Sequence, residues 1–233
     1  MALRIHPEIF GLFPGLQLAV VRTDTIDNHR ERPGIGPFLE EAWREAGEAV
    51  AAFGNPQSHP RIEPWRTRLR AAGASPREFP SSVEALARRA GRGGDPFRIN
   101  PLVDFYNAVS LRHLVPAGGF DLAAVGSDVD LRVTRGGERF AKLGTDGEEP
   151  VGAGEVAYLC GEEVLTRHFV WRQSRIAAIT PDTGTVMLMA EVLGEIEPPV
   201  ASEVADALTS GIHSFFGAEA RTAVLSEDRP ELD

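Results

Sequence analysis

The chain is poor in cysteine and has no long hydrophobic run. Cys160 is the only cysteine among 233 residues, so no intramolecular disulfide can form and a cytoplasmic location is the default expectation. No apolar stretch approaches the roughly 18 residues that a transmembrane helix needs. The N-terminal stretch carries a single Arg and is interrupted by Pro7 and Pro14, unlike a signal peptide. We therefore expect no membrane partner.

The motifs of metal, nucleotide and nucleophile chemistry are also missing. The six histidines form no H-x-x-x-H or H-E-x-x-H pair, and one cysteine cannot build a zinc knuckle. There is no P-loop, no G-x-G-x-x-G after a strand and no G-x-S-x-G. A thiolate pair of Cys160 with His168 is conceivable, although a small apolar residue at a strand end is the simpler interpretation. We expect no cofactor and no metal.

Positive charge is scarce except in one segment. The net charge of −10 argues against a general nucleic-acid binder and against DNA, because such proteins need a basic face. Between Arg61 and Asn100, nine arginines stand against four acidic residues, a local charge of +5 that leaves −15 for the remainder. This segment either binds the phosphates of one specific RNA or solvates two surface helices. The candidates for phosphate contacts are Arg66, Arg68, Arg70, Arg88, Arg89 and Arg92.

The hydrophobic pattern predicts helices first and strands later. With 42% hydrophobic and 25% charged residues, the chain can build an ordinary globular core. Apolar periodicity predicts a strand over 16–22 and helices over 37–54, 59–72, 81–94, 101–114 and 198–217. Short β-rich runs occupy 129–135, 138–144, 155–160, 163–170, 174–180 and 185–194. The last 14 or so residues read as a frayed acidic tail. We therefore expect an α+β fold with a mixed or antiparallel β block and a closing helix.

The helix expected over 101–114 carries an unusual polar row. Asp104, Asn107 and Ser110 fall within one 120° arc, yet the helix is apolar nearly all round and should be buried. It is followed by Gly118-Gly119, which would either make a tight turn or let backbone N–H groups approach a ligand closely. These residues are the first part of an expected hydrogen-bonding pocket.

Two further segments supply the rest of this pocket. Arg167, Trp171 and Arg172 place planar donors beside an aromatic ring, a set that can hold a carboxylate, a phosphate or a base. The alternative is a sheet edge whose side chains cover a neighbouring helix. Glu191 ends an otherwise apolar strand, where its carboxylate is either solvated or directed into a cavity.

Together these segments resemble the B3/B4 domain of the bacterial phenylalanyl-tRNA synthetase β subunit, in its free-standing form. The stretch LVDFYNAVSLRHLVPAGGFD is similar to the synthetase pattern VVD-x-TNYV…G-x-P-x-H-A-F-D, and GEVAY, LTRHFVWRQ and PDTGTVMLMAEV follow in the order of the free-standing members. The resemblance covers about 60–215. It implies a B3/B4-like domain over 56–217, with the strand and helix of 1–55 integral to it and a C-terminal tail over 218–233.

The resemblance also implies a function. In the synthetase, this domain hydrolyses mischarged tRNA, so the pocket would take the aminoacyl ester at the 3′ end of tRNA. Asn107 and Glu191 carry over as pocket residues, and Arg167, Trp171 and Arg172 would hold the amino acid or the terminal adenosine. No residue is assigned as catalytic. Gly118 replaces the His of the synthetase pattern, which weakens the analogy with synthetase editing.

Three functional hypotheses follow from the sequence. The first is a trans-editing aminoacyl-tRNA deacylase that acts without an attached synthetase, with tRNA as its partner. The second is a non-catalytic module that binds a free amino acid or a similar metabolite. The third is an interaction protein that docks on a synthetase or a translation factor.

Overall fold

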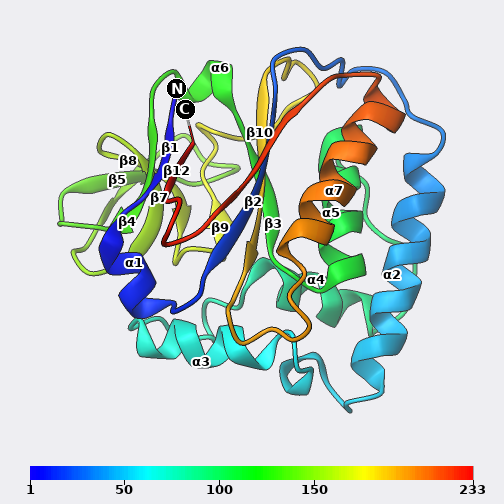
Figure 1. The fold of residues 1–233 in the computed structure, drawn as a ribbon, viewed down its shortest axis with the longest axis horizontal. Coiled ribbons are helices and arrows are strands. Elements are labelled where there is room, and N and C mark those ends of the chain that lie inside the picture. Colours follow the sequence, from blue (N-terminus) through cyan, green and yellow to red (C-terminus); the bar gives the residue numbers. More distant parts are fainter. Residues whose placement is uncertain (233) are drawn as a thin grey trace.

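Two β-sheets and a helical layer make up the computed structural model, which describes residues 1–232 (Figure 1). The smaller sheet has the order β11-β2-β10-β3, and all its neighbours are antiparallel. Its strands are β2 (Gln17–Thr23), β3 (Ala117–Asp121), β10 (Val186–Val192) and β11 (Arg221–Leu225). The central strand β10 is buried along its whole length, whereas β3 lies at the edge.

The larger sheet has the order β12-β1-β4-β7-β8-β5-β6, with β9 paired to β8. Its pairs are antiparallel except β1 with β4 and β5 with β8. Its strands are β1 (Leu3–Ile5), β4 (Val129–Val133), β5 (Glu138–Ala141), β6 (Glu148–Val151), β7 (Val156–Cys160), β8 (Glu163–Arg167), β9 (Arg172–Gln173) and β12 (Glu231–Leu232).

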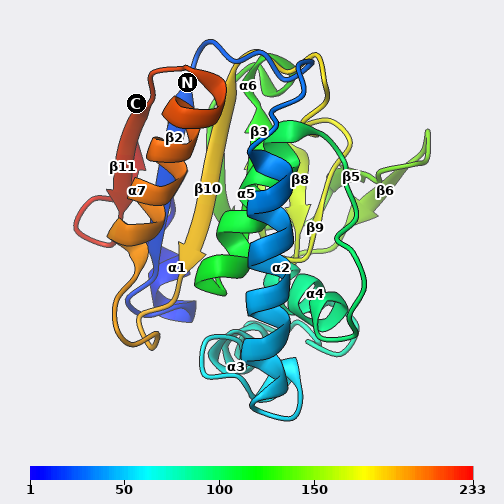
Figure 2. The ribbon, with the colours of Figure 1, turned by 90° about the vertical axis from the view of Figure 1, so that its right-hand side faces the viewer.

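Three long helices form the layer beside the smaller sheet (Figure 2). They are α2 (Ile35–Ala51), α5 (Pro101–His113) and α7 (Ala201–Gly211), of which α5 and α7 contact the sheet and α2 packs on α5. The shorter elements are α1 (Pro7–Leu12), η1 (Pro56–Ser58), α3 (Glu63–Ala71), α4 (Ser82–Ala90), α6 (Leu122–Val125) and the π-helical turn η2 (Ile212–Phe216). None of the helices in 1–232 combines the length and the apolarity of a membrane span.

Helix α5 is the centre of the helical layer. Its start is set by the Asn100 side chain, which accepts a hydrogen bond from Val103 N at 3.0 Å, and by Pro101 in the first turn. Its end is set by Leu114, which adopts a left-handed conformation. Because α2 covers one side of α5 while the sheet and α7 cover the other, nearly every side of the helix needs apolar residues. This arrangement confirms the expectation of a buried helix.

The expected α+β fold class is confirmed, and each of the five expected helices has a counterpart. Helix α4 begins at an N-cap, because the Ser81 side chain accepts a hydrogen bond from Glu84 N. The strand expected over 174–180 was wrong: Ser174 makes only an isolated bridge. The side-chain hydroxyl of Ser174 donates to Ala141 O and accepts from Ile176 N, which curls this segment instead of extending it.

The C-terminal segment is the second correction. The expected frayed tail instead supplies β11, which pairs with β2 over five residues, and β12, which pairs with β1. Ala223 and Leu225 are buried and flank the half-buried Val224, so β11 completes the smaller sheet with an apolar inner face. Residue 233 of the expected tail lies outside the described part of the chain.

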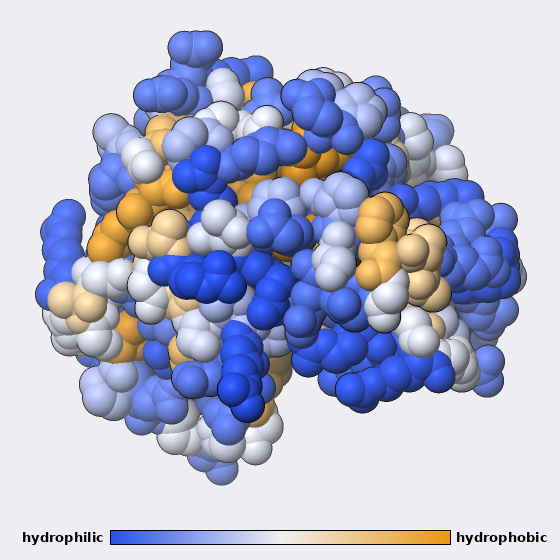
Figure 3. All heavy atoms as spheres, turned by 90° about the horizontal axis from the view of Figure 1, so that it is seen from below, coloured by the Kyte–Doolittle hydropathy of each residue, from blue (hydrophilic) through white to orange (hydrophobic). Residues whose placement is uncertain are grey.

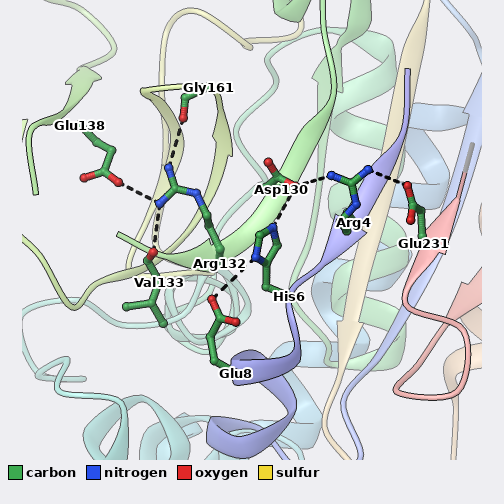
Figure 4. A network of polar contacts seen from close by, with 9 residues as sticks. All are labelled: Arg4, His6, Glu8, Asp130, Arg132, Val133, Glu138, Gly161 and Glu231. Carbon is green, nitrogen blue, oxygen red and sulfur yellow. Dashed lines mark hydrogen bonds and ion pairs between the residues drawn. The ribbon is translucent and has the colours of Figure 1, made fainter. Parts of the chain in front are cut away.

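The two ends of the described chain lie side by side and are tied by a polar network (Figure 4). Arg4 donates to Asp130 Oδ1 at 3.4 Å and to Glu231 Oε1 at 2.8 Å, and His6 Nε2 lies 3.1 Å from Asp130 Oδ1. These contacts connect β1, β4 and β12. Each contact is partly solvated and therefore weak, so these contacts select the position of β12 more than they stabilise the fold.

Two helical glycines provide a test of the packing. A Cβ on Gly211 would overlap the ring of Phe105, whereas a Cβ on Gly11 meets nothing within 4 Å. We expect Gly211→Ala to lower the free energy of unfolding by about 1–3 kcal/mol through overpacking. Gly11→Ala should raise it by up to about 1 kcal/mol. Urea denaturation measures both, and a Gly211→Ala variant as stable as Gly11→Ala would contradict the described contact of α7 with α5.

Candidate functional site

A cavity of about 300 Å³ opens beside β3, the edge strand of the smaller sheet. Helices α4 and α5 and the segment 166–173 enclose its other sides. The inner wall is largely apolar, and its main residues are Val103, Tyr106, Phe120, Phe169 and Met189. A cavity with apolar walls and a few polar groups is the usual form of a site for a small molecule or a chain end.

The floor of the cavity is a carboxyl group paired with a phenol. Glu191 on β10 is 5% exposed, and Tyr158 on β7 is 1% exposed. The Tyr158 hydroxyl donates to Glu191 Oε1 at 2.9 Å. Oε2 of Glu191 has no hydrogen-bond partner within residues 1–232, and Glu191 lines the cavity. Its carboxyl is therefore directed into the cavity and not toward solvent.

Burial sets the protonation of this pair. Removal from water raises the pKa of Glu191 to about 7, against a smaller opposing effect of the Tyr158 hydrogen bond. Burial, together with the nearby Glu191 carboxylate, also raises the pKa of Tyr158 well above its usual range. The phenol thus remains a donor at neutral pH, while the carboxyl exchanges its proton there.

Gly118 and Gly119 lie in strand β3, so the tight turn, one of the two alternatives for these glycines, was wrong. They pair with Met189 and Leu188 of β10, which keeps the backbone extended. A Cβ on Gly119 would lie 2.6 Å from the Leu188 side chain and 2.8 Å from that of Ile179, so packing excludes a larger residue. A Cβ on Gly118 meets nothing within 4 Å, so Gly118 leaves the cavity wall open where the resemblance expects a His.

The edge position of β3 leaves a backbone donor beside the cavity. Glu191 N donates to Pro116 O, and Leu122 N donates to Thr185 O. In an antiparallel ladder, every second residue of a strand hydrogen-bonds to a given neighbour. The two bonds show that the even-numbered residues of β3 bond to β10. Gly119 therefore directs its N–H and C=O away from β10. Gln173 Nε2 donates to the Gly119 carbonyl at 2.7 Å. The Gly119 N–H remains available to a bound group.

The polar row of α5 divides into one cavity residue and two structural residues. Asn107 lines the cavity, and its amide makes no hydrogen bond within the described chain. The expectation for Asp104 and Ser110 was wrong, because neither lines this cavity. Asp104 accepts from Arg98 Nε at 2.7 Å and from Ile99 N at 2.9 Å, and Ser110 donates to Val115 O at 2.6 Å. Residues three apart on an α-helix differ by 60° in direction, so the side chains of Asp104 and Ser110 lie on either side of that of Asn107.

The segment 166–173 divides in the same way. Trp171 and Arg172 line the cavity. Arg167 does not, because its guanidinium donates to Glu155 Oε1 and Glu149 Oε1, each at 2.7 Å. The expectation that Arg167 belongs to the pocket was therefore wrong. Cys160 and His168 are not paired either, since the Cys160 Sγ lies 3.1 Å from Ser127 Oγ while His168 stacks on Phe79.

Sequence reasoning missed several cavity residues, of which Tyr158 is the most informative. Alternation in the β7 stretch EVAYLC places Val156 and Tyr158 on one face and Ala157 and Leu159 on the other. The two faces belong to different clusters, because Val156 and Tyr158 join the main core and Ala157 and Leu159 a small core of the larger sheet. A buried tyrosine in such a strand requires a hydrogen-bond acceptor, which was the available signal.

Half of the six arginines proposed to contact phosphates are occupied by acidic partners. Glu84 is fully buried and accepts from Arg66 at 2.8 Å and from Arg88 at 2.6 Å, and Arg68 pairs with Glu195. Arg70 and Arg92 are exposed, and Arg89 lines the cavity. The lower face of the molecule, over α3, is mostly hydrophilic (Figure 3). The positive charge available to a phosphate is thus smaller than the number of arginines in this segment suggests.

Four residues supply the polar groups of the cavity. Within 1–232, no three His, Cys, Asp or Glu side chains come together as a metal site. The polar groups at hand are the carboxyl of Glu191, the phenol of Tyr158, the amide of Asn107 and the N–H of Gly119. These groups can position a ligand with donors at one end and a carbonyl at the other.

Comparison with known proteins identifies the family. The sequence profile of the B3/4 domain matches residues 65–197, which include all of these cavity groups. The chain belongs to the B3/4 domain family. The B3/4 domain is similar to a solved N-terminal fragment of the phenylalanyl-tRNA synthetase β subunit from Pyrococcus horikoshii, with 12% identity and a TM-score of 0.44 over 94% of this chain. It spans about half of that fragment (50%). No curated protein matches the chain.

The pKa of Glu191 predicts how stability depends on pH. A carboxyl whose pKa rises from 4.5 to about 7 on folding stabilises the protein fully below pH 4.5, and this stabilisation is lost as the pH rises through 7. Relative to Glu191→Gln, we expect the wild-type free energy of unfolding to fall by up to about 3 kcal/mol between pH 4.5 and 8. Urea titrations at each pH measure it.

Tyr158→Phe provides the control for this prediction. Loss of the phenol donor should raise the pKa of Glu191 further, so the decline still begins near pH 4.5 but continues to higher pH than in the wild type. Parallel pH profiles for the wild type and Glu191→Gln would show that Glu191 is not the titrating group.

Proposed function

We propose that this B3/4 domain binds the aminoacylated 3′ end of tRNA and hydrolyses the ester of mischarged aminoacyl-tRNA without an attached synthetase. The observation that carries the proposal is the convergence of the Glu191–Tyr158 floor, the Asn107 amide and the Gly119 N–H on one cavity. Family membership supports it, because the synthetase β-subunit domain that this chain resembles acts on tRNA.

The groups of the cavity suit the two ends of an aminoacyl ester. Glu191 is the more deeply buried group and would accept a hydrogen bond from a polar group of the amino acid, such as its ammonium. Asn107 and the Gly119 N–H would donate to the ester carbonyl and to the oxyanion that forms when water attacks it. The bond to the 3′ oxygen of the ribose then breaks, and the proton of the attacking water ends on that oxygen. The protein supplies position and hydrogen bonds, which suffice for an ester that is already labile.

A second candidate function has a specific observation in its favour. Arg66, Arg68 and Arg88 are held by acidic side chains, which reduces the positive charge available to a polyanion. The cavity would then serve a free amino acid without catalysis. A ligand that binds only the native state raises stability by RT ln(1 + [L]/Kd), so thermal shifts with free amino acids identify this case.

The deacylation assay is the direct test. The purified protein is incubated with total tRNA charged separately with each amino acid, and loss of the ester is followed above the no-enzyme rate. We expect loss with one or a few amino acids. Asn107→Ala should lower kcat by about 10²–10³-fold, the usual cost of one oxyanion donor. Gln57→Ala, an exposed amide outside the cavity, is the matched control.

The outcomes of this assay separate the two candidates. No ester loss with any amino acid, together with a thermal shift by a free amino acid, would favour the binding module. Equal activity of Asn107→Ala and Gln57→Ala would remove Asn107 from the reaction while leaving deacylation itself intact.

The arginines allow a second test that leaves the fold intact. Arg70 and Arg92 are exposed and have no acidic partner within residues 1–232. We expect Arg70→Glu with Arg92→Glu to weaken tRNA binding and to reduce the slope of log K against log salt by about 0.7–0.9 for each lost phosphate contact. Filter binding over a salt series measures both quantities. Arg135→Glu, an exposed arginine of the β4–β5 turn, is the control.

Arg66 is unsuitable for that test. Arg66→Glu would place two carboxylates beside each other at the buried Glu84 site, and breaking a buried ion pair costs about 3–5 kcal/mol. A loss of tRNA binding in that variant would report unfolding. An unchanged salt slope in the Arg70 and Arg92 variant would show that these side chains do not meet the tRNA backbone.

A further inference from the structure

Two arginine–aromatic pairs line the mouth of the cavity. The Arg89 guanidinium carbon lies 5.0 Å from the centre of the Phe97 ring, and that of Arg172 lies 4.5 Å from the Trp171 ring. All four residues border the cavity of about 300 Å³. Arg89 and Phe97 come from α4 and the segment after it, whereas Trp171 ends the β8–β9 connection and Arg172 begins β9. The mouth is therefore built from two independent parts of the chain.

These two arginines differ from the other arginines near the cavity in their charge partners. Arg66, Arg88, Arg98 and Arg167 are all paired with carboxylates. Arg89 and Arg172 make neither an ion pair nor a side-chain hydrogen bond within the described chain, so their donors are unused. An aromatic ring with an uncompensated guanidinium above it offers a flat surface and a positive charge at one place.

The aromatic side chains beside these arginines are held in place. Phe97 is 37% exposed and packs edge-on against Trp43 at 6.0 Å, and Trp171 packs edge-on against Phe79 at 4.7 Å. The segment that carries Phe97 is anchored at Asp104, which accepts from Arg98 Nε and Ile99 N. The rings are thus positioned before any ligand binds, which lowers the entropic cost of binding.

We propose that the mouth pairs, Arg89–Phe97 and Arg172–Trp171, form a clamp for the terminal nucleotide of an RNA 3′ end. The base stacks on the aromatic and guanidinium planes, and the adjacent phosphate accepts hydrogen bonds from the two arginines. A nucleotide joins a planar base to an anionic phosphate, which matches an aromatic ring beside an uncompensated guanidinium. The proposal rests on the proposed function, since it places the nucleotide at the mouth and the aminoacyl group at the Glu191 floor.

Binding of the uncharged RNA trinucleotide CCA tests the clamp without any ester chemistry. Trp171 is the most accessible of the three tryptophans, because Trp43 and Trp65 are buried. Stacking of a base on Trp171 should therefore quench the fluorescence of this tryptophan. We expect Phe97→Leu and Trp171→Leu each to raise the Kd for labelled CCA, measured by fluorescence anisotropy, by about tenfold. Phe53→Leu changes an exposed phenylalanine outside the cavity and should leave the Kd unchanged.

The arginines are tested in the same assay. Arg89→Gln and Arg172→Gln should weaken CCA binding and make it less sensitive to salt, whereas Arg135→Gln should not. An unchanged Tm for each variant shows that the fold is intact. Adenosine, which has no phosphate, serves as the comparison ligand. Its Kd should change little in the two arginine variants but should still rise in Phe97→Leu and Trp171→Leu.

The outcomes separate the clamp from the proposed function. If the wild type does not bind CCA, or if the Phe97 and Trp171 variants bind it as the wild type does, the clamp is wrong whatever the deacylation assay shows. If CCA binds and the variants weaken it while no charged tRNA is hydrolysed, the clamp stands and the deacylase function fails. If charged tRNA is hydrolysed and the variants change neither kcat nor KM, the clamp fails and the deacylase function stands.

Discussion

A hydrogen bond between Tyr158 and Glu191 connects the two sheets at the floor of the cavity. Each partner is buried on its own strand, and this is the one side-chain hydrogen bond that either makes within residues 1–232. A buried polar group without a partner costs about 1–3 kcal/mol, so the bond favours the arrangement in which β7 of the larger sheet faces β10 of the smaller one. The cavity is the space that remains beside this contact, where β3 ends the smaller sheet and no further strand covers its edge.

The edge strand explains why the site contains so few reactive side chains. In the middle of a sheet, the Gly119 N–H would be used by a neighbouring strand. At the edge it is available, and its carbonyl is satisfied by Gln173 in place of a strand. The domain thus obtains a donor from its backbone, and Asn107 supplies the second from α5. In the proposed deacylation, these two donors would position the ester, since hydrolysis of an activated ester needs placement more than a strong nucleophile.

Sequence alone predicted the helices better than the site. The apolar periodicity of 37–54 and 101–114 is a local signal, and the structure contains both helices as α2 and α5. The division of Asp104, Asn107 and Ser110 between structure and cavity was not predictable, because it depends on how the chain turns at the two ends of α5. These turns bring Arg98 to Asp104 and the Val115 carbonyl to Ser110. The strand β3 was missed since two glycines favour a turn locally, and only pairing with β10 extends them. Tyr158 was missed because its partner is 33 residues away.

The charge distribution has a consequence for how a polyanion can approach. A molecule of net charge −10 repels a nucleic acid from most directions. At 0.15 M salt this repulsion extends only about 8 Å, so the unpaired guanidinium groups at the cavity mouth act at short range within a repulsive surround. Encounters in other orientations are short-lived. The acidic surface would therefore select the orientation of an incoming RNA, so that its terminus meets the mouth while its helical arms are kept in solution.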